Sequence, residues 1–158
     1  MRIGCGYDVH QLVVGRPMIL GGVRLSFEKG LAGHSDADVL VHAVIDAILG
    51  AAALGDIGKH FPDTNTNYAN VSSLLLLKEI ASLLNKKRYK VVNIDSTVVL
   101  ERPKLAPYID QMRKNVADCL ELNQDEVSVK ATTSEKLSFV GKEEGVAAYA
   151  VVLIEKIT

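Results

Sequence analysis

Val146-Ala147-Ala148-Tyr149-Ala150-Val151-Val152-Leu153-Ile154 is the stretch that decides the fold, because it is apolar throughout, with no alternation between apolar and polar positions. A strand of this kind is normally buried on both faces of its sheet. Helices of the same chain can cover one face of a small sheet. The other face also needs a cover, and the economical candidate is another copy of the chain. The segment therefore predicts a central strand in a sheet that takes part in assembly.

The rest of the chain predicts further strands and three helices. Strands are expected over residues 2–10, 89–100 and 127–132, and helices over about residues 37–53 and 69–86 and from about residue 104 onward. The first helix is apolar on most sides, which is typical of a buried helix. Neither a repeat nor an interdomain linker interrupts the pattern. We therefore expect one α+β domain over residues 1–158, in which helices pack on one face of a small β-sheet and the other face is used in assembly.

Composition excludes several classes of function. The chain has 158 residues and a net charge of −1, so electrostatics alone gives no reason to bind nucleic acid or an anionic membrane. Cys5 and Cys119 lie far apart in the chain and give no disulfide framework, which favours a reducing compartment, the cytoplasm. The N-terminus lacks the features of a signal peptide. The longest apolar stretch, residues 39–54, is interrupted by polar residues, so no membrane span is expected.

Three residues form a metal-ligand pattern. Asp8 and His10 are separated by one residue of the N-terminal strand, so their side chains point to the same face. His42 lies on the first helix and can reach both if that helix packs on the strand. Two imidazoles and one carboxylate leave one position open on a tetrahedral zinc ion, which is the layout of a catalytic site. The alternative is that Asp8 and His10 only cap the end of a strand, and that His42 is a core histidine whose hydrogen bonds are made within the protein.

Two carboxylates flank His42 on the same helix face, Asp38 at i−4 and Asp46 at i+4. Either could orient the imidazole of His42. The alternative is ordinary helix polarity, which is the preferred interpretation for Asp38. Just before the helix, His34 could donate to an anion near the metal, although a loop histidine is usually only solvated. Ser35 or Asp36 can cap the helix.

Three further stretches could carry chemistry. Thr132-Thr133-Ser134-Glu135 predicts either a capping box or a helix N-terminus that binds phosphate, with Glu135 as a magnesium ligand. The polar loop at residues 55–70 is long for a connector and could place acceptors for polyol hydroxyls, although turn chemistry also explains it. The two prolines of Leu100–Pro107 fix an extended turn whose backbone could recognise a base edge. A plain connector is the alternative there.

Taken together, these stretches resemble the 2-C-methyl-D-erythritol 2,4-cyclodiphosphate synthase family over essentially the whole length. The resemblance is carried, in order, by Gly4-x-Gly6-Tyr7-Asp8-x-His10, Gly33-His34-Ser35-Asp36-Ala37-Asp38 leading to His42, Gly55-Asp56-Ile57-Gly58 with Phe61-Pro62-Asp63, and Lys130-Ala131-Thr132-Thr133-Ser134-Glu135. That family is a homotrimer of the non-mevalonate isoprenoid pathway, with active sites between neighbouring subunits. It converts 4-diphosphocytidyl-2-C-methyl-D-erythritol 2-phosphate into the cyclic diphosphate and CMP. The resemblance thus implies a trimeric phosphorus–oxygen lyase with a small cytidine diphosphate substrate.

The resemblance also implies roles for individual residues. Asp8, His10 and His42 hold zinc and Glu135 helps to hold magnesium or manganese, one of each ion per active site. His34 and Thr133 are the catalytic residues, which position and stabilise the reacting phosphates. The backbone of the Leu100–Ala106 turn, with Ala131 and Thr132, reads cytosine. The substrate-binding residues are Asp8, His10, His34, Ser35, Asp56, Ile57, Gly58, Phe61, Asp63, Leu100, Lys104, Leu105, Ala106, Ala131, Thr132, Thr133, Glu135, Phe139 and Lys142.

The chain departs from the family pattern near a cavity on the trimer axis that is thought to hold prenyl diphosphates. Lys142 stands where the family commonly has Arg, and Tyr149 where it often has Glu. Lysine keeps the positive charge but loses the bidentate fork of arginine. Ser138, where the family often has Gly, is a smaller change. These departures concern the axial cavity rather than the active site.

Two other functions remain to be compared with cyclisation. A zinc-dependent nucleotide diphosphate phosphodiesterase that uses water would need the same ligands and would release a linear product. A non-catalytic trimeric metal-binding or scaffold protein would leave Thr133, Glu135 and the Asp56 loop without a role.

Overall fold

The fold is built on β7, Gly145–Lys156, which is the central strand of a five-stranded sheet with the order β4-β1-β7-β5-β6. β7 pairs in antiparallel fashion with β1, Arg2–Val14, and with β5, Tyr89–Val99. β6, Val127–Thr132, runs parallel to β5, and β4, Lys29–Leu31, pairs with the end of β1. The structure is a computed structural model that describes residues 1–62 and 64–157. The predicted central strand is confirmed.

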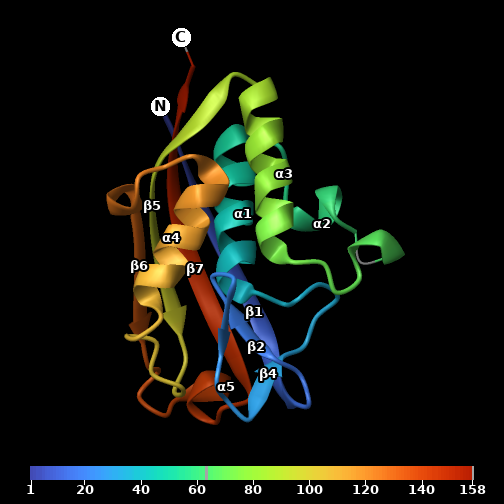
Figure 1. The fold of residues 1–158 in the computed structure, drawn as a ribbon, viewed down its shortest axis with the longest axis vertical. Coiled ribbons are helices and arrows are strands. Elements are labelled where there is room, and N and C mark those ends of the chain that lie inside the picture. Colours follow the sequence, from blue (N-terminus) through green and yellow to red (C-terminus); the bar gives the residue numbers. More distant parts are fainter. Residues whose placement is uncertain (63, 158) are drawn as a thin grey trace.

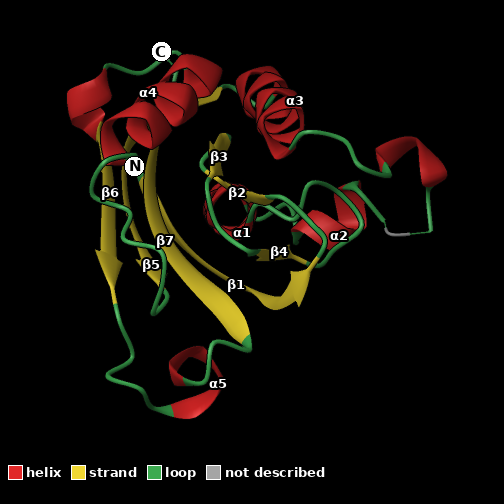
Figure 2. Cartoon of the chain, turned by 60° about the horizontal axis from the view of Figure 1, so that its bottom comes forward, coloured by secondary structure: helices red, strands yellow, loops and turns green. Residues whose placement is uncertain are grey.

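Helices cover one face of this sheet, as predicted (Figures 1 and 2). The helices are α1 (Val39–Ala52), α2 (Ile57–His60), α3 (Ser73–Lys86), α4 (Ile109–Leu120) and α5 (Ser138–Gly141); the shorter elements are β2 (Met18–Leu20), β3 (Val23–Leu25) and the 3₁₀ turns Thr66–Tyr68 and Gln124–Glu126. α4 begins later than predicted, because the chain first closes a turn in which Tyr108 N–H donates to Leu105 O (2.8 Å). The N-cap of α1 is Asp38, not Ser35 or Asp36.

The two faces of the sheet differ in burial. On the helix side of β7, Ala148 and Val152 are fully buried. On the other side, Tyr149 and Val151 remain 49% and 40% exposed. The single chain therefore buries one face of the strand and leaves the other exposed, as expected if a second copy is to cover it. Alternation is present in the structure but hidden in the sequence, because the outward residues are apolar too.

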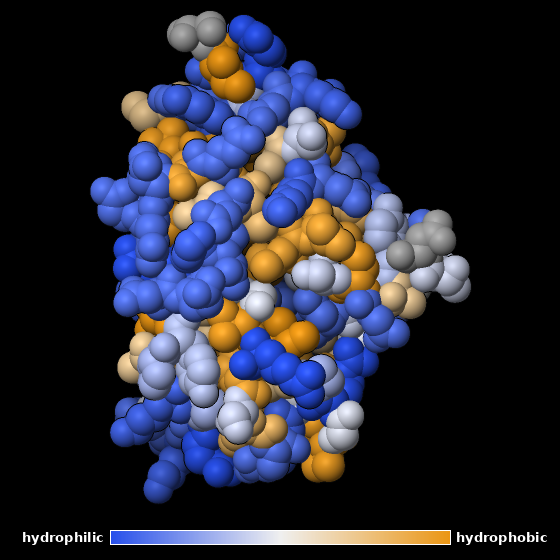
Figure 3. All heavy atoms as spheres, in the orientation of Figure 1, coloured by the Kyte–Doolittle hydropathy of each residue, from blue (hydrophilic) through white to orange (hydrophobic). Residues whose placement is uncertain are grey.

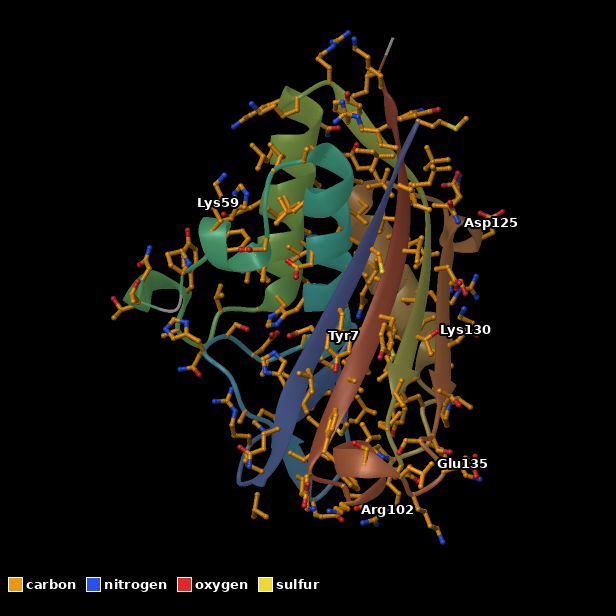
Figure 4. The ribbon with its side chains drawn as sticks, turned by 180° about the vertical axis from the view of Figure 1, so that it is seen from behind. Tyr7, Lys59, Arg102, Asp125, Lys130 and Glu135 are labelled. Atoms are coloured by element: carbon orange, nitrogen blue, oxygen red, sulfur yellow. The ribbon has the colours of Figure 1, made fainter. Side chains whose placement is uncertain are left out.

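We call the exposed apolar side of β1 and β7 the outer face. Tyr7 lies on it, and its ring packs against that of Tyr149 with centroids 4.9 Å apart (Figure 4). The residues of the outer face are Ile3, Cys5, Tyr7, Val9, Tyr149 and Val151. By contrast, hydrophilic residues cover much of the helix side, with hydrophobic patches between them (Figure 3). Exposed apolar side chains grouped on a sheet surface are typical of an interaction site.

α1 lies directly on β1 because two strand residues have no side chain. A Cβ atom added to Gly4 would lie 1.9 Å from the Ala47 carbonyl oxygen, and one added to Gly6 would lie 2.0 Å from the Ala43 carbonyl oxygen. Ala43 and Ala47 are one helical turn apart, so the same side of α1 faces both glycines. This close approach brings the start of α1, which carries His42, next to the middle of β1. None of the described helices has the length and apolarity needed to cross a membrane.

Gly6→Ala should lower the free energy of unfolding by about 3 kcal/mol or more, because the methyl group would overlap helix backbone that cannot move aside. Gly50→Ala is the matched control. Gly50 lies on the exposed side of α1, where a Cβ atom meets only one atom at 4.0 Å. That substitution should be neutral or stabilise by up to about 1 kcal/mol. Urea unfolding measures both, and equal stabilities for the two variants would contradict this packing.

Candidate active site

Three side chains from two elements converge on one point beside α1. Asp8 Oδ2 on β1 lies 3.0 Å from His10 Nε2 and 3.0 Å from His42 Nδ1. The two ring nitrogens are 3.1 Å apart. Side-chain exposures of 27% for Asp8, 18% for His10 and 12% for His42 show that the cluster is partly shielded from solvent. The predicted ligand set is therefore brought together.

The donor set and its spacing fit zinc. A tetrahedral zinc ion with bonds of about 2.0–2.2 Å separates its ligand atoms by roughly 3.3–3.5 Å. The three atoms in this cluster are within a few tenths of an ångström of that spacing. The outer nitrogen of His10, Nδ1, lies 2.7 Å from Ala32 O, an acceptor that requires a proton on that nitrogen. Neutral His10 therefore turns a lone pair at Nε2 toward the cluster.

The outer nitrogen of His42 does not meet either carboxylate that the sequence suggested. Asp38 accepts from the backbone N–H groups of Gly21, Gly22 and Val41, and burial raises the pKa of its carboxyl to about 6. Asp46 instead accepts from Ile57 N–H at 2.7 Å, so it anchors the start of α2.

Two serines, rather than a carboxylate, contact the outer nitrogen of His42. His42 Nε2 lies 2.9 Å from Ser73 Oγ and 3.1 Å from Ser35 Oγ. Ser73 was missed because in the sequence it is one of two adjacent serines before a leucine run, which is typical of an ordinary helix start.

Proton balance within the cluster follows from its mutual contacts. Burial disfavours the charged carboxylate of Asp8, but hydrogen bonds and charge interactions with His10 and His42 outweigh it and lower the pKa of Asp8 to about 2. Burial likewise disfavours the charged form of His10. The hydrogen bond and charge of Asp8, with the Ala32 carbonyl, nevertheless raise the pKa of His10 above its ordinary value. The carboxylate of Asp8 and the inward ring nitrogens of His10 and His42 thus favour a cation between them. When no metal is bound, that cation is a proton.

A cavity of about 240 Å³ opens beside the cluster. Its lining includes residues from three of the four predicted motifs, and it adds Gly33, Tyr68 and Leu76, which were not among the predicted site residues. The predicted residues that line it are Asp8, His10, His34, Ser35, His42, Ile57, Gly58 and Phe61. Asp56 is exposed and caps α2 by accepting from Lys59 N–H at 3.0 Å. Asp63 lies outside the described residues.

The remaining predicted residues gather at the end of β6. Leu100 N–H donates to Thr132 O at 3.0 Å, which joins the Leu100–Ala106 turn to the Thr132–Glu135 stretch. Leu100 and Leu105 are buried, so only their backbone can face a ligand. The exposed residues of this end are Lys104, Ala106, Ala131, Thr132, Thr133, Glu135, Phe139 and Lys142. Figure 4 shows Glu135 and Arg102 at this end of the sheet, on the opposite side of the view from Lys59 of α2.

Both predictions for Thr132–Glu135, a capping box and a phosphate-binding helix N-terminus, are wrong, because no helix begins there. Thr133 Oγ1 instead donates to Glu135 Oε1 at 3.0 Å, in a turn where Glu135 has a φ of 54°. Sequence reasoning also missed Glu101, whose carboxylate accepts from Ser134 N–H and Oγ–H, both at 3.0 Å, and from Lys136 N–H at 3.3 Å. These bonds lower the pKa of Glu101. They fix the turn that presents Thr133 and Glu135.

The two groups do not meet within one chain. Among the residues described, none from the Leu100–Ala106 turn or the Ala131–Lys142 segment lines the cavity beside Asp8, His10 and His42. In a single chain the two groups therefore belong to separate parts of the surface.

Comparison with known proteins identifies the class. A model of the YgbB family matches residues 1–155. The 2-C-methyl-D-erythritol 2,4-cyclodiphosphate synthase of Chloroherpeton thalassium is 61% identical over 157 residues, covering 99% of this chain and 100% of the relative. The synthase of Clostridium botulinum is 59% identical over 155 residues, covering 98% and 100%. The fold and the Asp–His–His cluster thus define a cyclodiphosphate synthase-like enzyme.

Solved structures agree with the sequence relatives. The bifunctional IspDF from Campylobacter jejuni superposes with a TM-score of 0.95 at 42% identity, over 99% of this chain and 42% of that chain. The Plasmodium falciparum IspF in its CDP complex gives a TM-score of 0.87 at 32% identity, over 99% and 97%. This chain belongs to the YgbB family, the 2-C-methyl-D-erythritol 2,4-cyclodiphosphate synthases, and is an enzyme of the phosphorus–oxygen lyase class. The α+β fold predicted from the sequence is confirmed.

Zinc affinity should fall as the pH is lowered through neutrality. Zinc must replace a proton held by His10, whose pKa is raised, whereas Asp8, with a pKa of about 2, has no proton to lose. Asp8→Asn should weaken binding and also shift the fall to lower pH, because the amide no longer holds the proton on His10. Competition with a chromophoric chelator between about pH 5.5 and 8.5 measures this. Affinity that stays constant over this range would contradict the expectation.

Proposed function

We propose that this chain converts 4-diphosphocytidyl-2-C-methyl-D-erythritol 2-phosphate into 2-C-methyl-D-erythritol 2,4-cyclodiphosphate and CMP. An oxygen of the 2-phosphate attacks the β-phosphorus, the bond between that phosphorus and the bridging oxygen breaks, and CMP leaves with the bridging oxygen. Atoms balance without water, and no protein nucleophile is needed. The observation that carries the proposal is the convergence of Asp8, His10 and His42 on one point in a chain whose full-length relatives are cyclodiphosphate synthases.

The metals of the proposed site follow from the chemistry of the donors. Asp8, His10 and His42 would hold zinc, because two imidazoles and one carboxylate are zinc ligands with one position left open. Glu135, a hard oxygen donor on an exposed turn, would help to hold magnesium or manganese. When bound, these ions supply positive charge that orients the diphosphate and offsets the charge that grows on its oxygens.

The side chains around the cavity do the positioning. The hydroxyl of Ser35 accepts from Ala37 N–H at 3.1 Å, which leaves its own proton available to a phosphate oxygen in the cavity. His34 lines the same cavity and would donate to a phosphate oxygen. Thr133 would stabilise the reacting phosphates from the β6 end. Holding the 2-phosphate close to the β-phosphorus turns the reaction into a preoriented intramolecular step.

The polyol and the cytosine of the substrate would be held by two different groups of residues. Asp56, Ile57 and Gly58, with Phe61 and Asp63, would contact the polyol. The backbone of Leu100, Lys104, Leu105 and Ala106, with Ala131 and Thr132, would read cytosine, and Phe139 and Lys142 would complete the pocket. Buried Leu100 and Leu105 support a backbone role for this turn, because their side chains point into the core.

A homotrimer explains two observations at once. Ile3, Tyr7 and Val9 are 71%, 46% and 43% exposed on the outer face, where water contact is unfavourable for apolar surface. The zinc cluster and the Thr133–Glu135 turn lie apart within one chain, so a complete site needs a neighbour. Assembly through the outer face would cover this apolar surface. It would also bring the zinc cluster of one chain next to the Thr133–Glu135 turn of its neighbour. Two unpaired cysteines, Cys5 and Cys119, support a place in the cytoplasm.

Phosphorus NMR of the reaction tests the activity. The purified protein, zinc and magnesium are incubated with the cytidyl substrate, and we expect CMP together with a cyclic diphosphate. CMP with a linear product would instead indicate a zinc phosphodiesterase that uses water. No turnover by the trimer would favour a non-catalytic metal-binding protein.

Glu135→Gln should reduce the magnesium-dependent activity by at least about tenfold while leaving the fold intact. Its side chain is exposed, so little packing is lost, and the amide is a weaker ligand for a hard cation. Magnesium titrations of the activity measure the effect. Glu79→Gln, an exposed change on α3, is the control and should behave as wild type. An unchanged magnesium response in Glu135→Gln would remove this residue from the metal site.

Val151→Asp should dissociate the trimer, and activity should fall in step with trimer content. Val151 is 40% exposed on the outer face, so in the trimer the new carboxylate would be buried without a partner. Val14→Asp is the control, because Val14 is 80% exposed and lies outside the outer face. Val152→Asp should instead unfold the chain, since Val152 is fully buried on the helix side. Sedimentation that shows a fully active Val151→Asp monomer would refute the shared site.

A further inference from the structure

His42 makes two different kinds of contact through its two ring nitrogens. Nδ1 faces the metal cluster, 3.0 Å from Asp8 Oδ2. Nε2 points the other way, 2.9 Å from the hydroxyl of Ser73, which is fully buried in the first turn of α3. The ring is therefore held between β1 and α3. Which nitrogen carries a proton decides which one can bind a metal.

The contacts of Ser73 settle where its own proton lies. Its hydroxyl donates to Asp36 Oδ1 in a short hydrogen bond, and its backbone N–H donates to Asp36 Oδ2 at 3.0 Å. A hydroxyl has only one proton, and an ionised carboxylate can only accept. Ser73 Oγ can therefore only accept from His42, which places the proton on Nε2 and leaves the lone pair of Nδ1 for the cluster.

Asp36 is itself held from the other side. Its Oδ1 accepts from Asp38 N–H at 3.2 Å, and its own N–H donates to Val71 O at 3.0 Å. Asp36, in the loop before α1, is thus tied both to the loop before α3, through Val71, and to the first turn of α3, through Ser73. A carboxylate behind a ligating histidine raises the basicity of that histidine and fixes its ring.

We propose that Asp36 and Ser73 are positioning residues that keep His42 protonated at Nε2 and so present Nδ1 to zinc. The inference rests on the zinc site of the proposed function, and it concerns residues that neither line the cavity nor form part of the ligand set. The nearby hydroxyl of Ser35 does not replace Ser73. It accepts from Ala37 N–H and keeps a free proton, so it has no carboxylate that forces it to accept from His42.

NMR of histidine-labelled protein tests the proton, and only four histidines need assignment. In zinc-free and in zinc-bound wild type, we expect a slowly exchanging imidazole proton on Nε2 of His42, because this group is buried and hydrogen-bonded. Ser73→Ala and Asp36→Asn should lose that slow exchange. Both should also weaken zinc binding by about 10–100-fold in competition with a chelator, the range typical of such outer partners.

Ser72→Ala is the matched control, because Ser72 precedes Ser73 at the same helix start and its side chain makes no capping hydrogen bond. It should keep both the Nε2 proton and the zinc affinity of wild type. Circular dichroism checks folding, and Asp36→Asn, at a partly exposed position, carries the test if Ser73→Ala does not fold.

Two results would overturn the proposal: a protected proton on Nδ1 of His42, or zinc affinity within about twofold of wild type in both variants. A wild type that shows the Nε2 proton in the zinc-free sample but binds no zinc would refute the metal site of the proposed function. The zinc-free spectra of the variants would then still decide whether Asp36 and Ser73 hold that proton.

Discussion

The contact between the α1 backbone and the two glycines of β1 is the constraint on which the site depends. Any side chain at Gly4 or Gly6 would overlap the carbonyl oxygens of Ala47 and Ala43. Because the helix lies this close to the strand, His42 at its start reaches Asp8 and His10, which follow the glycines on the same side of β1. A helix held farther away by ordinary side chains would leave the three ligand atoms too far apart for one ion.

The same contact explains why the Asp8–His10–His42 cluster is both shielded and tied to several elements. β1 supplies Asp8 and His10, and α1 supplies His42. Behind His42, the loop before α1 supplies Asp36 and the first turn of α3 supplies Ser73. Each ligating ring thus has its outer nitrogen engaged: His10 with a backbone carbonyl, His42 with a hydroxyl backed by a carboxylate. Rings fixed in this way need little reordering when a cation binds, which favours affinity.

At the other end of the sheet, charge rather than close packing shapes the chain. Glu101 holds the turn at Ser134 and Lys136, and Arg102 donates to both Glu143 and Glu28. The bonds of Glu101 fix the turn in which Thr133 and Glu135 are exposed to solvent. An apolar outer face and an exposed, preformed turn are the features on which the proposed trimer and its shared site rest.

The sequence by itself determined the features that depend on local spacing. Asp8 and His10 share a face because strand side chains alternate, and the apolar Val146–Ile154 run specifies a central strand. The family of the protein was likewise recognisable from motifs that follow one another along the chain, and the comparisons confirm this family. Only the tertiary structure decided the partners of His42, the true role of Asp38 as cap of α1, and the exposure of Tyr149 and Val151. Those features depend on which distant segments come into contact, and the pairing of Asp36 with Ser73, 37 residues apart, leaves no periodic signal in the sequence.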